Sequence, residues 1–309
     1  MRLLITGASG LLGLNLALRI AQDADNDHIV YGSVHRHTIK TGAFQVIETD
    51  LLQPGAVERL LDQVQPDWVI HCAALADVDA CEGSPSLAHQ MNTALPAQLA
   101  SYVARGGARL VHISTDAVFD GQRGLYREED QPNPLSVYAR SKLEGELAVA
   151  AANPEAIIAR VNLFGWSLSG RRSLAEFFFN NLSAGKQVNG FTDVFFCPVL
   201  VNDLAPLLLK MLSRGLRGLY HATGRDCTSK YEFGRAIAAH FGLDAGLIQP
   251  ISVQQAGLKA MRSPNLTLRT DKLSRDLGEP PLSLADGLAN FYRLYQQGYP
   301  EMLRQLAAQ

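Results

Sequence analysis

The chain has 309 residues, of which 47% are hydrophobic and 19% charged, so it can bury a large core and is not intrinsically disordered. Its net charge of −2 comes from 28 basic and 30 acidic residues, a balance that speaks against nucleic acid or an anionic membrane as a partner. No apolar run reaches the roughly 18 residues of a transmembrane helix, and the first apolar run is too short for a signal peptide. We therefore expect a cytoplasmic protein.

The four cysteines are Cys72, Cys81, Cys197 and Cys227. They form no C-x-x-C pair and no metal-ligand spacing. Four cysteines in a chain of this length predict buried thiols in a reducing compartment. We expect no metal site.

The opening residues contain the strongest local pattern of the chain. An apolar run over residues 1–6 is followed by Gly7, Gly10 and Gly13, and an amphipathic segment begins at Leu11. This order predicts a strand, a tight turn and a helix whose N-terminus faces a diphosphate. Gly7 suits a positive φ, Gly10 lets the ligand approach the backbone, and Gly13 allows close packing. The predicted cofactor-binding residues here are Gly7, Ser9, Gly10, Leu11, Leu12 and Gly13. A glycine-rich turn without a ligand is the alternative.

The segments that follow alternate between strand-like and helix-like patterns. We predict strands at residues 28–34, 44–47, 68–74, 109–114 and 156–161, and helices at residues 54–64, 85–105 and 137–152. Such alternation predicts an α/β fold with a doubly wound parallel (Rossmann) sheet. Its ligand is expected at the carboxyl ends of the strands.

The regular alternation of strand-like and helix-like segments ends after Trp166. We assign residues 1–165 to a dinucleotide-binding Rossmann domain and residues 166–309 to a smaller, mixed substrate-binding domain. Helices are predicted at 173–182 and 229–241, followed by short helices with breaks at Pro250, Pro264 and Pro280. The chain is expected to return to the sheet within residues 198–221.

The end of the second predicted strand indicates which nicotinamide cofactor binds. An NAD site usually has an acidic residue there for the ribose 2′-hydroxyl, whereas this strand ends in Val34-His-Arg36-His37. A cation at Arg36 suits a 2′-phosphate. The sequence therefore favours NADP(H), with NAD as the alternative cofactor and a solvated surface arginine as the alternative role of Arg36.

Tyr138 and Lys142 are spaced four residues apart at the start of a predicted helix, so they lie on one face. A tyrosine pKa of about 10 is too high for efficient proton transfer at neutral pH, and lowering it by about 3 units requires roughly 4 kcal/mol. We expect Lys142, together with a positively charged nicotinamide, to supply this difference. An ordinary exposed helix pair is the alternative.

A third group follows the strand at residues 109–114. The hydroxyl of Thr115 can hydrogen-bond a reacting carbonyl, whereas alternation turns Ser114 toward the sheet interior. Asp116, next in the chain, is grouped with Thr115 as a substrate-binding residue. A turn cap is the alternative role of either hydroxyl.

Together with further motifs, these residues resemble the extended short-chain dehydrogenases/reductases, and more narrowly the dTDP-4-dehydrorhamnose reductase family. The motifs that carry the resemblance are Gly7-x-x-Gly10-x-x-Gly13, Cys72-Ala-Ala74, Asn92, Ser114-Thr-Asp-Ala-Val-Phe-Asp-Gly121, Tyr126-Arg-Glu-Glu-Asp130, Tyr138-x-x-x-Lys142, Lys142-Leu-Glu-Gly-Glu146, Arg160-Val-Asn-Leu-Phe-Gly165, Val201-Asn-Asp-Leu-Ala205 and Arg262-Ser-Pro264. They extend over nearly the whole chain.

The resemblance implies roles for individual residues. Tyr138 is the expected proton donor, Lys142 holds the nicotinamide ribose, and Thr115 orients the keto group. Asn92 braces the active-site helix, and Arg262 contacts a nucleotide phosphate. The resemblance further implies that four residues lie along the cofactor, namely Asp50, Leu51, Ala73 and Ala74. The implied reaction transfers hydride from NADPH to C4 of a keto-deoxysugar nucleotide, and the resemblance is compatible with a homodimer.

Departures from the family pattern keep alternatives open. Ala117 stands where the reductases carry tyrosine, which puts rhamnose itself in doubt as the sugar. Sugar-nucleotide dehydratases need an extra carboxylate that Ala117 cannot provide. The family also contains the methionine adenosyltransferase β subunit, so a cofactor-binding regulatory subunit is an alternative, as is a sugar epimerase. The acidic run Glu128-Glu129-Asp130 is expected to be a solvated loop rather than a magnesium site.

Overall fold

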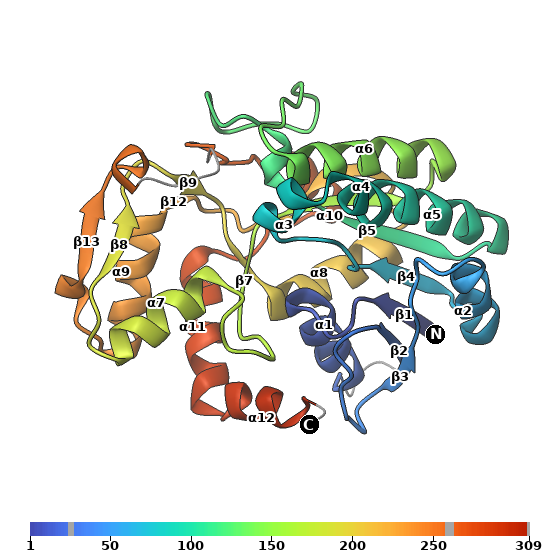
Figure 1. Ribbon diagram of the computed structural model, residues 1–309, viewed down its shortest axis with the longest axis horizontal. Helices are drawn as coiled ribbons and strands as arrows, with labels where there is room; N and C mark the ends of the chain where they lie inside the picture. Colours follow the sequence, from blue (N-terminus) through green and yellow to red (C-terminus); the bar gives the residue numbers. More distant parts are fainter. Residues whose placement is uncertain (24–27, 257–262, 308–309) are drawn as a thin grey trace.

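A parallel sheet forms the centre of the protein (Figure 1). The computed structural model describes residues 1–23, 28–256 and 263–307. Within these ranges seven strands lie in the order β11-β6-β5-β4-β1-β2-β3, and all their pairings are parallel. Their bounds are β1 Arg2–Thr6, β2 Ile29–Val34, β3 Gln45–Glu48, β4 Trp68–His71, β5 Arg109–Thr115, β6 Ile157–Val161 and β11 Gly218–His221. The predicted doubly wound fold is confirmed, and the order reverses between β1 and β4.

Helices cover both faces of the sheet because alternate strand residues point to opposite sides. Leu3 and Ile5 pack into the larger core cluster, with residues of α1 (Leu11–Ala21) and α8 (Val201–Ser213). Leu4 joins the second cluster with three other helices. These are α2 (Ala56–Val64), α5 (Leu95–Gly106) and α6 (Val137–Ala152).

The predicted helix at residues 85–105 is interrupted. The structure has α3 (Val78–Gly83), α4 (Pro85–His89) and a π-helical turn, η1 (Gln90–Ala94), before α5. The turn places Asn92 against α6, where its Nδ2 donates to the Ser141 hydroxyl at 3.0 Å and to the Leu75 carbonyl at 3.0 Å. A single π turn of this kind often marks a functional site.

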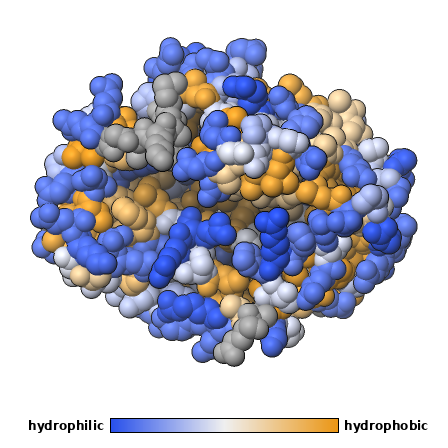
Figure 2. Space-filling model, in the orientation of Figure 1, coloured by the Kyte–Doolittle hydropathy of each residue, from blue (hydrophilic) through white to orange (hydrophobic). Residues whose placement is uncertain are grey.

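Most of the remaining elements form a second group beside the sheet, on the left in Figure 1, whereas α10 (Asp271–Leu277) packs on β11 at the edge of the sheet and the 3₁₀ turn η2 (Asp116–Val118) directly follows β5. The second group includes three two-stranded pairings, β7–β10, β9–β12 and β8–β13. The bounds of these elements are β7 Leu163–Phe164, α7 Leu174–Ser183, β8 Val188–Phe191, β9 Phe195–Phe196, β10 Val199–Leu200, β12 Thr228–Ser229, α9 Lys230–Phe241, β13 Ile248–Ile251, α11 Leu284–Gln296 and α12 Tyr299–Gln305, with 3₁₀ turns η3 Ala245–Leu247 and η4 Val253–Ala256. Figure 2 shows a mostly hydrophilic face with a hollow near its centre, between this group and the sheet.

Two details of the second half differ from the prediction. Pro250 does not break the chain but lies within β13, opposite Gly190 of β8, which an edge strand permits. The C-terminal helices are not all short, since α11 has 13 residues. The chain re-enters the sheet through β11, and the division at residue 165 remains a prediction.

The cysteine prediction is wrong for one pair. Cys197 and Cys227 form a disulfide, whereas Cys72 and Cys81 are free. The disulfide forms because β9 and β12 are neighbours in space. The two cysteines are 30 residues apart along the chain, and this separation does not indicate that they meet. Across the described ranges, no helix is both long and apolar enough to cross a bilayer.

Candidate active site

The glycine turn joins β1 to α1 at the reversal of strand order. The predicted positive φ of Gly7 is confirmed at +68°, and a Cβ there would lie 2.9 Å from the Ala73 backbone. A Cβ on Gly13 would lie 2.4 Å from the Gly7 carbonyl oxygen, so only glycine permits this approach. Gly10 is exposed beside the start of α1, whose first turn contains no acidic residue. The first N–H groups of a helix lack intrahelical partners and favour an anion.

The other residues predicted in this turn differ in exposure. Ser9 and Leu11 are half-buried, whereas the Leu12 side chain is buried in the core. Only the backbone of Leu12 can therefore face a ligand.

Thr6 ties the glycine turn to the end of β4. Its hydroxyl oxygen accepts from the backbone N–H groups of Cys72 and Ala73, both at 3.2 Å, and lies 2.7 Å from Nδ1 of His71. Because this oxygen already accepts twice, its own proton points to His71 Nδ1. These hydrogen bonds fix the end of β4 next to Gly7, so the predicted residues Ala73 and Ala74 lie close to the glycine turn.

Arg36 and Asp50 lie near each other at the ends of β2 and β3. Arg36 is exposed. The Asp50 carboxylate accepts from the Leu52 backbone N–H at 3.0 Å and from the Gln53 side chain at 3.1 Å. The Gln53 hydrogen bond, followed by that of Leu52, lowers the Asp50 pKa, and the positive charge of Arg36 contributes to the same shift. Leu51 is half-buried in this turn.

Three of the predicted catalytic residues meet where β5 ends and α6 begins. Ser136 caps α6 by accepting from Ala139 N–H at 3.1 Å, which sets the orientation of the first turn. The Tyr138 phenol hydrogen-bonds the Thr115 side chain. One turn further along, Lys142 is buried and its Nζ donates to the Ile113 carbonyl at 2.7 Å.

The expected depression of the Tyr138 pKa does not arise from the protein's own groups. Burial raises the pKa of this phenol to about 12, the Thr115 hydrogen bond opposes the rise, and the Asp116 charge adds to it. Burial also lowers the pKa of Lys142 to about 8. The expectation neglected the desolvation of the phenol, which outweighs the opposing hydrogen bond of Thr115.

Behind Lys142, a buried ion pair stiffens the layer between sheet and helix. Arg160 donates to both carboxylate oxygens of Glu146, at 2.9 and 2.7 Å. The Ser114 hydroxyl donates to the same carboxylate, so Ser114 faces the interior as alternation predicted. The Glu146 charge counteracts the lowering of the Lys142 pKa. Breaking such a buried pair is costly.

Asp116 directly follows Thr115 and is also buried. Its carboxylate accepts hydrogen bonds from the Asn162 side chain and the Thr115 hydroxyl. Burial nevertheless raises the Asp116 pKa to about 6, and the charge of Lys230, at the start of α9, opposes the rise. The start of α9, in the second group of elements, is thus close enough to Asp116 for the Lys230 charge to act there.

Two predictions concern sites other than this cluster. Arg262 lies outside the described residues. The acidic loop is occupied by protein contacts, since Asp130 pairs with Arg123 and Glu128 accepts from the His221 N–H at 3.0 Å. In the part of the chain that the structure describes, no three His, Cys, Asp or Glu side chains could hold a metal ion.

Three side chains of this site had no predicted role. Glu146 follows Lys142 by four residues, so the helical spacing that pairs Tyr138 with Lys142 also extends to Glu146. Asn162 follows β6, the neighbour of β5, and the ends of adjacent parallel strands meet at one edge. No sequence pattern indicated that Lys230 lies near Asp116, because Lys230 belongs to the second group of elements.

Comparison with known proteins agrees with this arrangement. The family model described as the RmlD substrate binding domain matches residues 1–297. The chain is 36% identical to the dTDP-4-dehydrorhamnose reductase of Mycobacterium tuberculosis over 269 residues, which are 85% of this chain and 83% of the relative. It is 35% identical to methionine adenosyltransferase 2 subunit beta of Bos taurus over 258 residues, 81% of this chain and 75% of the relative.

A solved structure has the same fold. The crystal structure of dTDP-4-dehydrorhamnose reductase from Bacillus anthracis in complex with NADP superposes with a TM-score of 0.80. It is 25% identical and covers 94% of this chain and 98% of its own. The similarity therefore includes both the sheet and the second group of elements.

Proposed function

The chain belongs to the RmlD substrate-binding-domain family, and on this premise we propose that it is an NADP(H)-dependent reductase of a nucleotide-linked 4-keto-deoxysugar. The dTDP-4-dehydrorhamnose reductases that it resembles in sequence and structure support this reaction class. The observation that carries the proposal is the cluster of Tyr138, Thr115 and buried Lys142 at the ends of the strands beside the glycine turn.

NADPH, when bound, supplies the hydride, and the chain's own residues supply binding and proton transfer. The residues that fit the cofactor are the glycine turn, whose Gly7 and Gly13 leave no room for a Cβ, and Arg36 for the 2′-phosphate. We assign four further residues to the same cofactor site, namely Asp50, Leu51, Ala73 and Ala74. Lys142, with three donors on its Nζ, holds a ribose hydroxyl while retaining its bond to Ile113.

Tyr138 delivers the proton. The phenol donates to the keto oxygen, and the Thr115 hydroxyl turns its proton from Asp116 to that oxygen and so fixes it in place. A pKa raised to about 12 by burial makes the free phenol a weak acid, so the positive charges of the site have to assist its ionisation. Lys142 is the nearest fixed source of such charge on the same helix face.

The substrate enters from the side of Asp116. Asp116 hydrogen-bonds the sugar, and Ala117 leaves space next to it because its side chain is a single methyl group. Arg262 is the proposed phosphate contact. The sugar that fits this space is the expected substrate. A panel of sugar substrates tests this directly.

The experiment is NADPH oxidation with a panel of nucleotide-linked 4-keto-deoxysugars, using the corresponding nucleotide diphosphates as controls. Turnover of at least one keto-sugar, with NADPH preferred over NADH, is the expected result. Tight NADP binding without oxidation by any ketone would contradict the proposal.

The second candidate is a regulatory subunit, favoured by the similarity to methionine adenosyltransferase 2 subunit beta. Such a protein binds cofactor and a partner enzyme without turnover. An epimerase would instead retain its cofactor through purification and show no net oxidation. The homodimer and the cytoplasmic location remain predictions, which sedimentation analysis and cell fractionation would test.

A further inference from the structure

The disulfide lies where three segments converge, namely β9, β12 and the stretch around Leu268. Cys197 directly follows β9, and Cys227 directly precedes β12. These two strands pair antiparallel, with Phe196 opposite Thr228. The cysteines are therefore the next facing pair of the ladder, with Cα atoms 4.0 Å apart. The bond extends a ladder that has only two residues on each strand.

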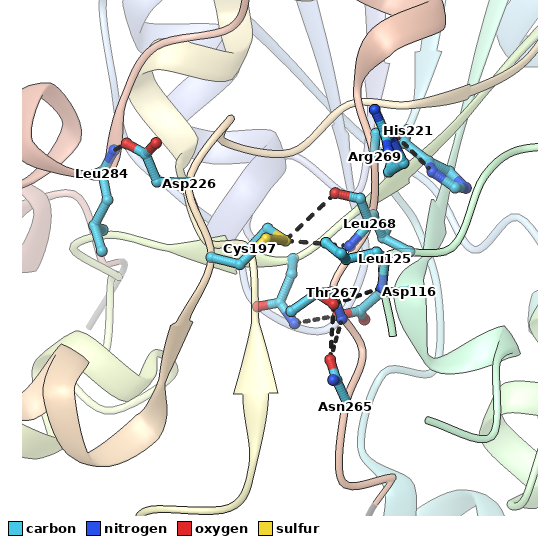
Figure 3. Close-up of a disulfide and its surroundings, with 12 residues drawn as sticks. Asp116, Leu125, Cys197, His221, Asp226, Asn265, Thr267, Leu268, Arg269 and Leu284 are labelled. Atoms are coloured by element: carbon cyan, nitrogen blue, oxygen red, sulfur yellow. Dashed lines mark hydrogen bonds between the residues drawn. A yellow bond between two sulfur atoms is a disulfide. The ribbon is translucent and has the colours of Figure 1, made fainter. Parts of the chain in front are cut away.

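The buried sulfur is connected to the rest of the site. Cys197 is 1% exposed, and its Sγ accepts from the Leu268 backbone N–H at 3.2 Å (Figure 3). Leu268 packs in a small cluster with Val118, two residues after Asp116. Two residues after Cys197, the Val199 N–H donates to the Asn162 carbonyl at 2.9 Å, and the Asn162 side chain holds Asp116.

The other sulfur belongs to an exposed residue and connects to α9. Cys227 is exposed. Ser229, two residues later, caps α9 by accepting from Glu232 N–H at 3.1 Å. Lys230, whose charge acts on Asp116, is the first residue of that helix. The disulfide thus ties the start of α9 to the segment that borders Asp116.

We propose that Cys227 is a thiol–disulfide exchange site through which a small dithiol controls how firmly α9 is held against the Asp116 side of the cleft. Exposed disulfides are the ones that exchange readily, and only Cys227 can be attacked from solvent. The consequence for the nucleotide sugar rests on the proposed function, whereas the exchange itself does not.

The chemistry is two successive displacements. A dithiol thiolate attacks Cys227 Sγ, the bond to Cys197 breaks, and the electron pair leaves on Cys197 Sγ, where the Leu268 N–H stabilises the thiolate before it is protonated. The second thiolate of the reagent then displaces Cys227, which is released as a thiol. The protein gains two electrons and two protons, and the dithiol becomes a disulfide.

The test compares the oxidised full-length protein with the same protein after dithiothreitol treatment. Thiol counting in denaturant should give two thiols before treatment, from Cys72 and Cys81, and four after it. Hydrogen exchange should then become at least about tenfold faster in residues 228–236 and stay unchanged in β1 and β4. Binding of dTDP should weaken about fivefold or more, with NADP binding unchanged.

Two variants separate the exchange site from a general effect of the reagent. Cys227→Ser should behave as reduced protein with or without dithiothreitol, whereas Cys81→Ser should respond as the parent does. Four thiols in protein kept under mild oxidant, or equal hydrogen exchange in residues 228–236 in both redox states, would overturn the proposal. Absence of turnover in both states, with the exchange difference intact, would instead count against the reductase assignment alone.

Discussion

At the scale of single residues, the site combines charges that are unfavourable for folding. Lys142 is 3% exposed, and burial lowers its pKa to about 8. Burying an ammonium destabilises the charged form. The buried Lys142 therefore lowers stability, as is common for residues in active sites.

This cost of burial predicts a pH dependence of stability. Between the folded pKa of about 8 and the ordinary lysine value, the unfolded chain binds a proton that the folded protein does not, so stability rises with pH. Lys142→Met removes the contribution. Between pH 7 and pH 9.5, the difference in free energy of unfolding between parent and variant should shift by about 2 kcal/mol in favour of the parent. Urea denaturation at several pH values measures it.

The matched control is Lys186→Met, at an exposed lysine. Its stability should follow that of the parent across the same pH range. A Lys142→Met protein that tracks the parent equally well would mean that Lys142 is not destabilised by burial. Only Lys142→Met should also lose turnover.

Arg36 is the residue proposed to determine the cofactor preference. Arg36→Ala should weaken NADPH binding by about 1.5–3 kcal/mol, the range for a hydrogen bond to a charged group, and leave NADH binding unchanged, because only NADPH carries the 2′-phosphate. Calorimetric titration with both cofactors checks this. Equal losses for NADPH and NADH would remove Arg36 from the phosphate site.

Much of the residue-level site could be predicted from the sequence. The glycines and the Tyr138–Lys142 spacing are local patterns, and local spacing determines which side chains share a face. The pKa of Tyr138 could not be predicted in the same way. It depends on how deeply the folded chain buries the phenol, and no local pattern contains that information.

At the scale of elements, α6 and the π turn η1 position the catalytic side chains. A Cβ on Gly145 of α6 would lie 2.1 Å from the Asn92 carbonyl oxygen. The two elements can therefore approach only because residue 145 is glycine. This contact keeps Asn92 within reach of Ser141, one residue from Lys142.

Gly145→Ala should consequently force η1 away from α6. We expect a loss of about 1–3 kcal/mol in the free energy of unfolding, the usual cost of overpacking, together with reduced turnover. The control is Gly106→Ala in α5, where a Cβ would meet nothing within 4 Å, and a helix should gain slightly. Chemical denaturation of both variants measures the difference, and equal stabilities would show that the close approach is not needed.

The sequence predicted the helices themselves but not the π turn between α4 and α5. Its cause is tertiary, because Asn92 bonds to Leu75 and Ser141, which are distant along the chain. The place of Pro250 within a strand has the same kind of cause, because β13 forms only by pairing with the distant β8.

At the scale of the whole molecule, the chain crosses between its two groups of elements. It leaves the sheet after β6, returns through α8 and β11, and leaves again. The alternation of strands and helices predicted the sheet because parallel strands need covering helices. The short pairings β9–β12 and β8–β13 escaped prediction, since each is set by contacts between distant segments.

The disulfide links the two ends of the segment that contains α8 and β11, with a sequence separation of 30 residues. Cys227→Ser should therefore lower the free energy of unfolding by about 2–4 kcal/mol. Dithiothreitol should destabilise the parent by a similar amount and leave the variant unchanged, as followed by thermal denaturation. If the reagent shifted both proteins equally, the effect would not come from this bond.

The central claim is that hydride passes from NADPH to a sugar carbon while Tyr138 delivers the proton. The most direct measurement uses NADPH deuterated at the transferable C4 position and a keto-sugar nucleotide that the protein turns over. We predict one deuterium at C4 of the sugar product, and a fall in kcat of about 100-fold or more for Tyr138→Phe with NADP affinity retained. Product without deuterium, or full activity in Tyr138→Phe, would contradict the account.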